Sequence, residues 1–167
     1  MKSSIIYGTN VLDTVRLIHN IIEEEKTKPF IRQLGLKLIK GVKEDNQTGE
    51  IKKLFYYVRD KIRFTRDVQG IETLQYPENT ANWGGGDCDC KTILLGALLK
   101  TIGNKIRFSI YKINNPDKFD HINLQVFLRR SNKWFTLDPT KKSKPFGWKP
   151  ENFFDQKIID FRKGWSL

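Results

Sequence analysis

The chain of 167 residues is long enough for one domain with a buried core, and its 38% hydrophobic and 29% charged residues are ordinary for a globular protein. This composition excludes collagen, coiled coils and wholesale disorder. The longest apolar stretch, residues 93–99, is too short to cross a bilayer, and the N-terminus lacks the apolar run of a secretory signal. We therefore expect a protein without a membrane span, cytoplasmic in the producing cell.

The net charge of +11 is concentrated in the last third of the chain. Residues 101–167 hold 14 basic and 6 acidic side chains, including the basic runs at 129–130 and 141–144. Such a surface either keeps the protein soluble or attracts an acidic partner. No nucleic-acid-binding motif accompanies the charge, so nucleic acid is the less expected partner.

The first 65 residues have helical patterns. Apolar residues recur at three- and four-residue steps in 11–26, where Asn10 can cap the start, and again in 29–41 and 50–64. The polar stretch between the last two predicts a loop. His19 lies in the first of these segments and is expected to pack rather than to react.

The second half changes from helical to strand periodicity. Residues 66–87 are rich in Gly, Pro and Asn and are predicted to form a long connection, which is followed by a helix over 88–102. Alternating patterns then predict three antiparallel strands, and the basic tail has a short element at 157–162. The strands are expected at 105–113, 121–129 and 133–138. Helices followed by strands indicate an α+β fold.

The only two cysteines, Cys88 and Cys90, stand where a glycine-rich loop turns into a helix, in WGGGDCDCKT. Unpaired N–H groups and the macrodipole at a helix N-terminus lower the pKa of a thiol, so this is a suitable place for a nucleophile. Asp87 is the expected N-cap. Because Asp87 and Asp89 repel a thiolate, we predict only a moderate lowering of the pKa of Cys88. Cys90 is expected to point away from the reacting side and to be structural.

A nucleophilic cysteine needs a base and a group that orients the base. His121 opens the second predicted strand, and Asp138 closes the third, in WFTLDPT. The start of one strand of a hairpin lies beside the end of the next, so the two side chains are expected to be neighbours. One imidazole nitrogen would bind the carboxylate and the other would face Cys88.

Residues 50–140 resemble the transglutaminase-like superfamily of papain-like cysteine hydrolases. The resemblance rests on GDCDCKTILLGALLKTIGNKIRF, on the histidine of DHINLQVFL and on the aspartate of KWFTLDPT. The segment ETLQYPENTANWGGGDCDCK is especially similar to short proteins of this type from bacteriophages and prophages, which suggests a virion association. Cys90 and Thr92 stand where those relatives often have Asp and Ala.

The resemblance implies a nucleophile-bearing helix packed on a small antiparallel sheet, with a helical part at 1–65, a catalytic core at 83–140 and a basic extension at 141–167 of a single domain, 1–167. It also implies a Cys88–His121–Asp138 triad that cleaves or transfers an acyl group of a protein or peptide without a cofactor. An oxyanion hole would combine the backbone N–H of Cys88 with a side chain of Asn82 or Trp83.

Two alternatives remain open from the sequence. The two cysteines, the histidine and the aspartate could bind zinc, but a CxC pair lacks the usual ligand spacing, so no metal is expected. The fold could also be a catalytically silent structural or binding module, for example in a phage particle, because fold alone does not determine function.

Overall fold

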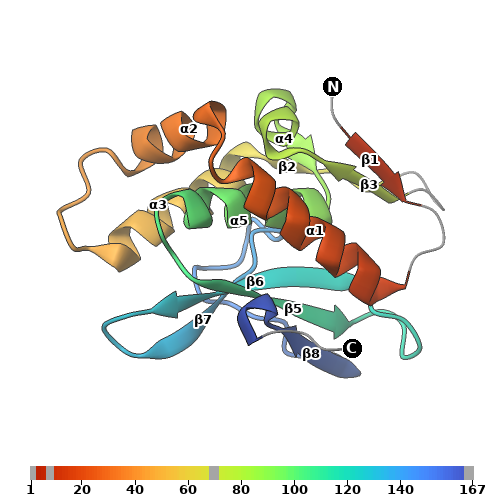
Figure 1. Ribbon diagram of the computed structural model, residues 1–167. Coiled ribbons are helices and arrows are strands. Elements are labelled where there is room, and N and C mark those ends of the chain that lie inside the picture. Colours follow the sequence, from red (N-terminus) through yellow and green to blue (C-terminus); the bar gives the residue numbers. More distant parts are fainter. Residues whose placement is uncertain (1–2, 7–9, 68–71, 164–167) are drawn as a thin grey trace.

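The computed structural model describes residues 3–6, 10–67 and 72–163 (Figure 1). Within them, the helices are α1 (Val11–Glu25), α2 (Pro29–Ile39), α3 (Gln47–Lys61), α4 (Pro77–Trp83) and α5 (Cys88–Thr101), with a 3₁₀ turn at Phe161–Lys163. The strands are β1 (Ser3–Ile6), β2 (Arg63–Phe64), β3 (Glu72–Gln75), β4 (Gly85–Gly86), β5 (Ile106–Lys112), β6 (His121–Leu128), β7 (Lys133–Leu137) and β8 (Asp155–Ile159). No helix of this described part is long and apolar enough to cross a bilayer.

The central element is α5, which packs against α1, α2, α3, α4 and β6 (Figure 1). Every residue from Cys90 to Leu99 is buried, because a helix that is apolar on all sides must be covered on all sides. The antiparallel sheet, in the order β7-β6-β5-β8, forms the opposite layer. The predicted α+β fold, with the helix that begins at Cys88 packed on a small antiparallel sheet, is confirmed.

The first helix and α5 begin where the sequence predicts, and side-chain caps explain why. The Asn10 side chain accepts hydrogen bonds from the backbone N–H groups of Leu12 and Asp13, at 2.8 and 3.1 Å. Asp87 accepts one from the N–H of Cys90 at 2.9 Å. These oxygens satisfy donors that a helix cannot pair internally.

The bounds predicted for the third helix are wrong, because it begins at Gln47 instead of residue 50 and ends at Lys61 instead of residue 64. Asn46 caps the new start by accepting from Gly49 N at 2.9 Å. Gln47 is buried and its amide donates to Asn104 Oδ1 and to the carbonyl of Phe127, at 2.8 and 2.9 Å. Gln47 thus anchors the helix to the loop before β5 and to the end of β6. A polar residue gives no sign in the sequence that it is buried and makes these contacts.

The predicted long connection over 66–87 is wrong for most of its described part. It contains β3, α4 and β4, while residues 68–71 lie outside the described residues. Strand β4 pairs in parallel with β2, with Arg63 opposite Gly85 and Phe64 opposite Gly86. The short element predicted at 157–162 is β8, which starts earlier and pairs with β5, followed by the 3₁₀ turn.

Close contact between α1 and α5 requires glycine at position 96. A Cβ at Gly96 would lie 2.5 Å from Ile22 Cδ1, closer than two carbon atoms approach, and 3.2 Å from Ile22 Cγ1, which is a tight contact. The missing side chain therefore lets the two helices approach each other, and it places the central helix against the core of the N-terminal part.

We predict that Gly96→Ala lowers the free energy of unfolding by about 1–2 kcal/mol, because overpacking outweighs the better helix propensity of alanine. Ile22→Val removes the Cδ1 atom that the new methyl group meets. In urea unfolding, the double variant Gly96→Ala/Ile22→Val should therefore lose less stability than the sum of the two single variants. Strictly additive losses would contradict this packing.

Candidate active site

The glycine segment before Cys88 is held in place by the backbone of β2. The N–H of Arg63 donates to the carbonyl of Gly84 at 2.8 Å, and the N–H of Thr65 donates to that of Gly86 at 3.1 Å. Gly84 has a φ of +71°, which lets the chain reverse directly after α4. These contacts fix the point at which α5 begins, and so the position of Cys88.

His121 and Asp138 are joined as the sequence predicts. His121 Nε2 lies 2.6 Å from Asp138 Oδ2. Strand pairing places Leu124 opposite Leu137, so Asp138, directly after β7, lies diagonally across from His121 at the start of β6. The hairpin thus brings together an imidazole and a carboxylate that are 17 positions apart in the chain.

The carboxylate of Asp138 is 1% exposed and fully engaged. Besides His121, it accepts from Asn123 Nδ2 at 3.2 Å and from the backbone N–H and the hydroxyl of Thr140, at 3.1 and 2.5 Å. Burial acts to raise the pKa of Asp138, but these donors and the charge of the imidazole outweigh it, so the pKa is lowered. Asp138 is therefore ionised and fixed at neutral pH.

Cys88 is half-buried at the first position of α5, against the start of β6. The backbone N–H of Ile122, the residue after His121, interacts with the Cys88 sulfur and favours its thiolate form. The carboxylate of Asp138 binds Nε2 of His121, and within the described residues no hydrogen bond occupies Nδ1. The imidazole is therefore oriented by one nitrogen and has the other available at the end of the strand that contacts Cys88.

The predicted lowering of the pKa of Cys88 is wrong. Burial, together with the negative charges of Asp89 and Asp87, raises it well above the ordinary value, and the Ile122 N–H offsets this only in part. The Cys88 Sγ lies 3.5 Å from Asp89 Oδ1, so the thiol can donate to a carboxylate. The resting form is a thiol, and any nucleophile has to be formed by transferring its proton to a base.

Cys90 takes no part in this arrangement. It is buried, and its thiol lies 3.4 Å from the carbonyl oxygen of Thr73. Burial raises its pKa, so it is a poor nucleophile. Within the described residues, no group of three or more His, Cys, Asp or Glu side chains is arranged to hold a metal ion. The other histidine, His19, stacks on Phe161 with ring centroids 4.3 Å apart, as a packing residue does.

Asn82 and Trp83, the candidates for the oxyanion hole, form the last turn of α4 just before the glycine segment. Both are exposed, and Trp83 is 69% exposed. They stand next to the point where the chain enters β4 and α5, but neither hydrogen-bonds to Cys88, His121 or Asp138 in the described structure. Their role stays a prediction.

Two features that support the site were missed. Asn123 and Thr140 hold Asp138, and their spacing gave a signal: Asn123 follows His121 by two residues on the same sheet face, and Thr140 follows Asp138 by two. Lys91 gave none. It is buried within an apolar helix, and its ammonium donates to the carbonyl of Ile62, just past the end of α3, at 2.7 Å. Burial lowers its pKa to about 8, while the charge of Asp138 acts against that.

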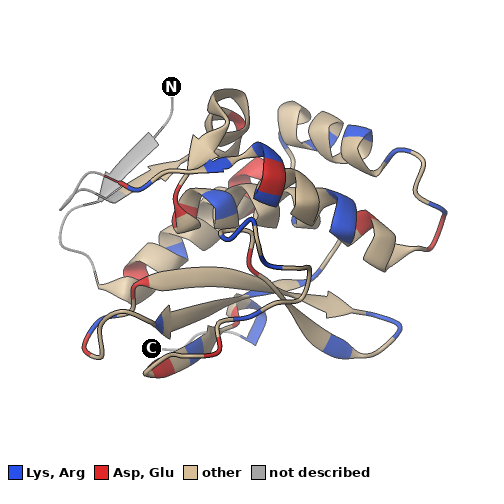
Figure 2. Cartoon of the chain, turned by 180° about the vertical axis from the view of Figure 1, so that it is seen from behind, with Lys and Arg blue, Asp and Glu red and all other residues tan. Residues whose placement is uncertain are grey.

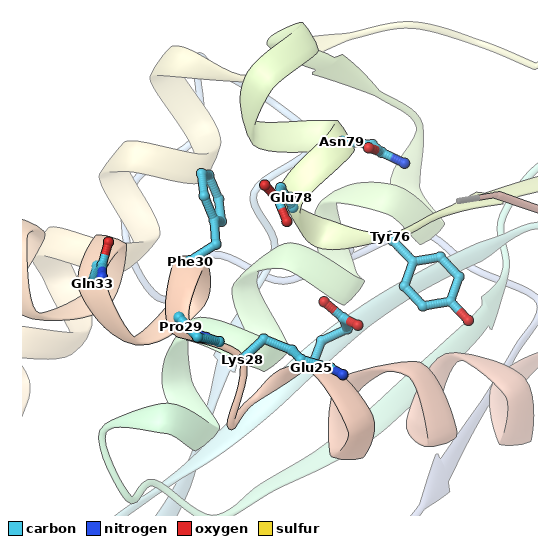
Figure 3. A pocket seen from close by; sticks show the side chains of 8 residues that line it. All are labelled: Glu25, Lys28, Pro29, Phe30, Gln33, Tyr76, Glu78 and Asn79. Carbon is cyan, nitrogen blue, oxygen red and sulfur yellow. The ribbon is translucent and has the colours of Figure 1, made fainter. Parts of the chain in front are cut away.

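A separate hollow of about 690 Å³ lies where α1 meets α2, beside the start of α4 (Figure 3). Glu25, Phe30, Tyr76 and Glu78 are among the residues that line it. None of the three predicted catalytic residues, Cys88, His121 and Asp138, is among the residues that line it.

We predict that Asp89→Asn makes Cys88 more reactive, because removing a neighbouring negative charge lowers the pKa of the thiol and raises the thiolate fraction. Alkylation of Cys88 by iodoacetamide at pH 8, followed by mass spectrometry, should be faster than in the wild type. Cys90 serves as the internal control and should stay slow in both proteins. An unchanged or slower reaction of Cys88 would contradict the electrostatic account.

Comparison with solved structures shows the same fold in proteins of very low identity. A candidate protease from Parabacteroides distasonis matches with a TM-score of 0.60 and 9% identity over 74% of this chain and 25% of the other. A candidate cysteine protease from Cytophaga hutchinsonii gives 0.55 and 13%, over 83% and 49% of the two chains. LapG from Legionella pneumophila gives 0.52 and 16%, over 75% and 74%. The chain thus spans only a quarter and a half of the first two proteins.

No curated protein matches the chain. The family model of the transglutaminase-like superfamily, however, matches residues 33–139, well over half of the sequence. This match includes α3, α4, α5 and the β5–β7 hairpins, together with the segments that hold Cys88, His121 and Asp138. The resemblance to phage proteins stays a prediction. The chain belongs to the transglutaminase-like superfamily.

Proposed function

We propose that the protein is a cysteine-dependent enzyme that attacks an amide carbonyl of a polypeptide and passes through a thioester. The proposal rests on the hydrogen bond of 2.6 Å between His121 Nε2 and the buried Asp138, which holds the imidazole and leaves Nδ1 available. The backbone N–H of the next residue, Ile122, contacts the Cys88 sulfur. This is a nucleophile with a base and an orienting carboxylate, as nucleophilic catalysis by cysteine requires.

In the first half of the reaction, the Cys88 thiol transfers its proton to His121 Nδ1 as the sulfur forms a bond to the carbonyl carbon. The imidazolium is stabilised by the ionised Asp138, whose donors keep it from taking up the proton. The carbon–nitrogen bond then breaks, and the leaving amine takes the proton from His121. The product is a Cys88 thioester.

In the second half, water or an amine attacks the thioester and gives up a proton to His121. The carbon–sulfur bond breaks, and the sulfur regains a proton from the imidazolium. Water gives hydrolysis, whereas an amine gives acyl transfer or crosslinking. We propose that backbone N–H donors near Cys88, completed by Asn82 or Trp83, stabilise the oxyanion.

A second candidate function is a binding module that retains the fold without the chemistry. The raised pKa of Cys88 favours it, since a thiol between Asp87 and Asp89 is a weak nucleophile at rest. The two candidates differ in whether His121 can deprotonate Cys88 when a carbonyl is present.

We predict that an activated acyl ester such as p-nitrophenyl acetate acylates Cys88, detected as an adduct on the Cys88 peptide by mass spectrometry. His121→Ala should slow acylation by about 10²–10⁴-fold, the usual contribution of general acid–base catalysis, and Cys88→Ala should abolish it. Adding a primary amine then distinguishes transfer from hydrolysis by the product formed.

The matched control is Cys90→Ala, which removes the other thiol and should leave acylation unchanged. Acylation at a comparable rate in wild type and His121→Ala would reject the enzyme and support the silent module. Circular dichroism of each variant excludes unfolding as the cause of a loss.

A further inference from the structure

Two basic segments far apart in the sequence lie together next to the site. Residues 52–66, from α3 through β2, hold six Lys or Arg and one acidic residue, and residues 139–150, after β7, hold four and none. These two segments form a surface, here called the basic face, and together carry +9 of the net +11 charge. Figure 2 shows basic stretches along the loop after β7 and on the helices behind it.

Specific contacts join the two halves of the basic face. Arg59 Nη1 donates to the carbonyl of Lys144 at 2.8 Å. The ring of Phe146 lies 5.5 Å from that of Phe55, and Lys52 Nζ lies 5.5 Å from the Phe146 ring centroid. The aromatic ring therefore seats the loop on α3, and the lysines around it stay on the outside.

Most of the cations on this face have no acidic partner. The single carboxylate, Asp60, is already held by Arg59, with Nε to Oδ1 at 2.7 Å and Nη2 to Oδ2 at 3.1 Å. No described carboxylate forms a salt bridge with the remaining exposed cations. These are Lys52, Lys53, Lys61, Arg63, Arg66, Lys141, Lys142 and Lys149. A concentration of positive charge that the protein does not neutralise attracts an anionic ligand.

The basic face adjoins the catalytic residues on two sides. Arg63 pairs with Gly85, three residues before Cys88, and Lys141 follows Asp138 by three residues. Electrostatic interactions indicate the same proximity. The charges of Lys142 and of the buried Lys91 both lower the pKa of Asp60, and the charge of Asp138 acts on the pKa of Lys91. A chain bound along this face would therefore lie next to the reacting atoms.

From these observations we propose that the basic face binds an acidic segment of a polypeptide substrate, rich in Asp and Glu, and brings a neighbouring amide to Cys88. This inference rests on the proposed function for the amide chemistry, but the binding itself does not require it. Exposed lysines recognise carboxylates by charge without a fixed geometry, so we expect selection for acidic composition over any particular sequence.

The test measures binding separately from chemistry. A fluorescein-labelled peptide of alternating Glu and Gly is titrated with the Cys88→Ala protein, and its anisotropy is followed at low and at physiological ionic strength. We expect binding that weakens with salt, and a Lys141→Gln/Lys142→Gln change that weakens it about 2- to 20-fold at low salt. The control Lys37→Gln/Lys40→Gln removes the same charge from exposed positions on and after α2 and should leave binding within about twofold.

Equal losses in the two double variants would overturn the proposal, because net charge alone would then explain the binding. Absence of binding, or tighter binding of a labelled single-stranded oligonucleotide that Lys141→Gln/Lys142→Gln abolishes, would overturn it too. The acylation of Cys88 by a neutral ester decides the proposed function independently, so the failure of one is distinguishable from the failure of the other.

Discussion

The site depends on one buried carboxylate. Asp138 is removed from water, and a buried negative charge is costly unless donors surround it. Four donors do so, from His121, Asn123 and the backbone and hydroxyl of Thr140. His121 and Asn123 lie on β6 and Thr140 lies on the turn after β7, so the pairing of β6 with β7 has to be in register for the charge to be satisfied. The same donors orient the imidazole and determine which of its nitrogens is available to Cys88.

The helical layer positions the other half of the site through α5. That helix is covered on all sides, its start is capped by Asp87, and its glycine approach is held by β2. Lys91 joins the layers, since its ammonium donates to the carbonyl of Ile62 just past the end of α3 and lies within the electrostatic reach of Asp138. The positions of Cys88 and of the basic face are thus coupled through the last turn of α3, which holds Arg59, and through Ile62 directly after it, which accepts from Lys91.

Much of this could be predicted from the sequence, because the strong signals are local. Apolar periodicity predicted α1, α2 and the β5–β7 hairpins, and a continuous apolar run predicted α5. The positions of His121 and Asp138 in the predicted hairpin indicated the hydrogen bond between them. The short elements α4 and β4 were missed. Strand β4 is held by parallel pairing with β2, which is a non-local contact without a sequence pattern. The raised pKa of Cys88 was missed because it depends on how deeply the sulfur is buried. The basic face could not be seen in a linear count, since it combines charges that are some eighty positions apart.

The most direct test of the account is the tautomer of His121. The chain has two histidines, so ¹⁵N-histidine NMR of the His19→Gln variant reports on His121 alone. If Asp138 accepts from Nε2–H, the neutral imidazole carries its proton on Nε2 and has an unprotonated Nδ1 that can take the thiol proton of Cys88. Asp138→Asn should disturb that preference. A neutral imidazole protonated on Nδ1, or a tautomer unaffected by Asp138→Asn, would contradict the assignment of His121 as the base.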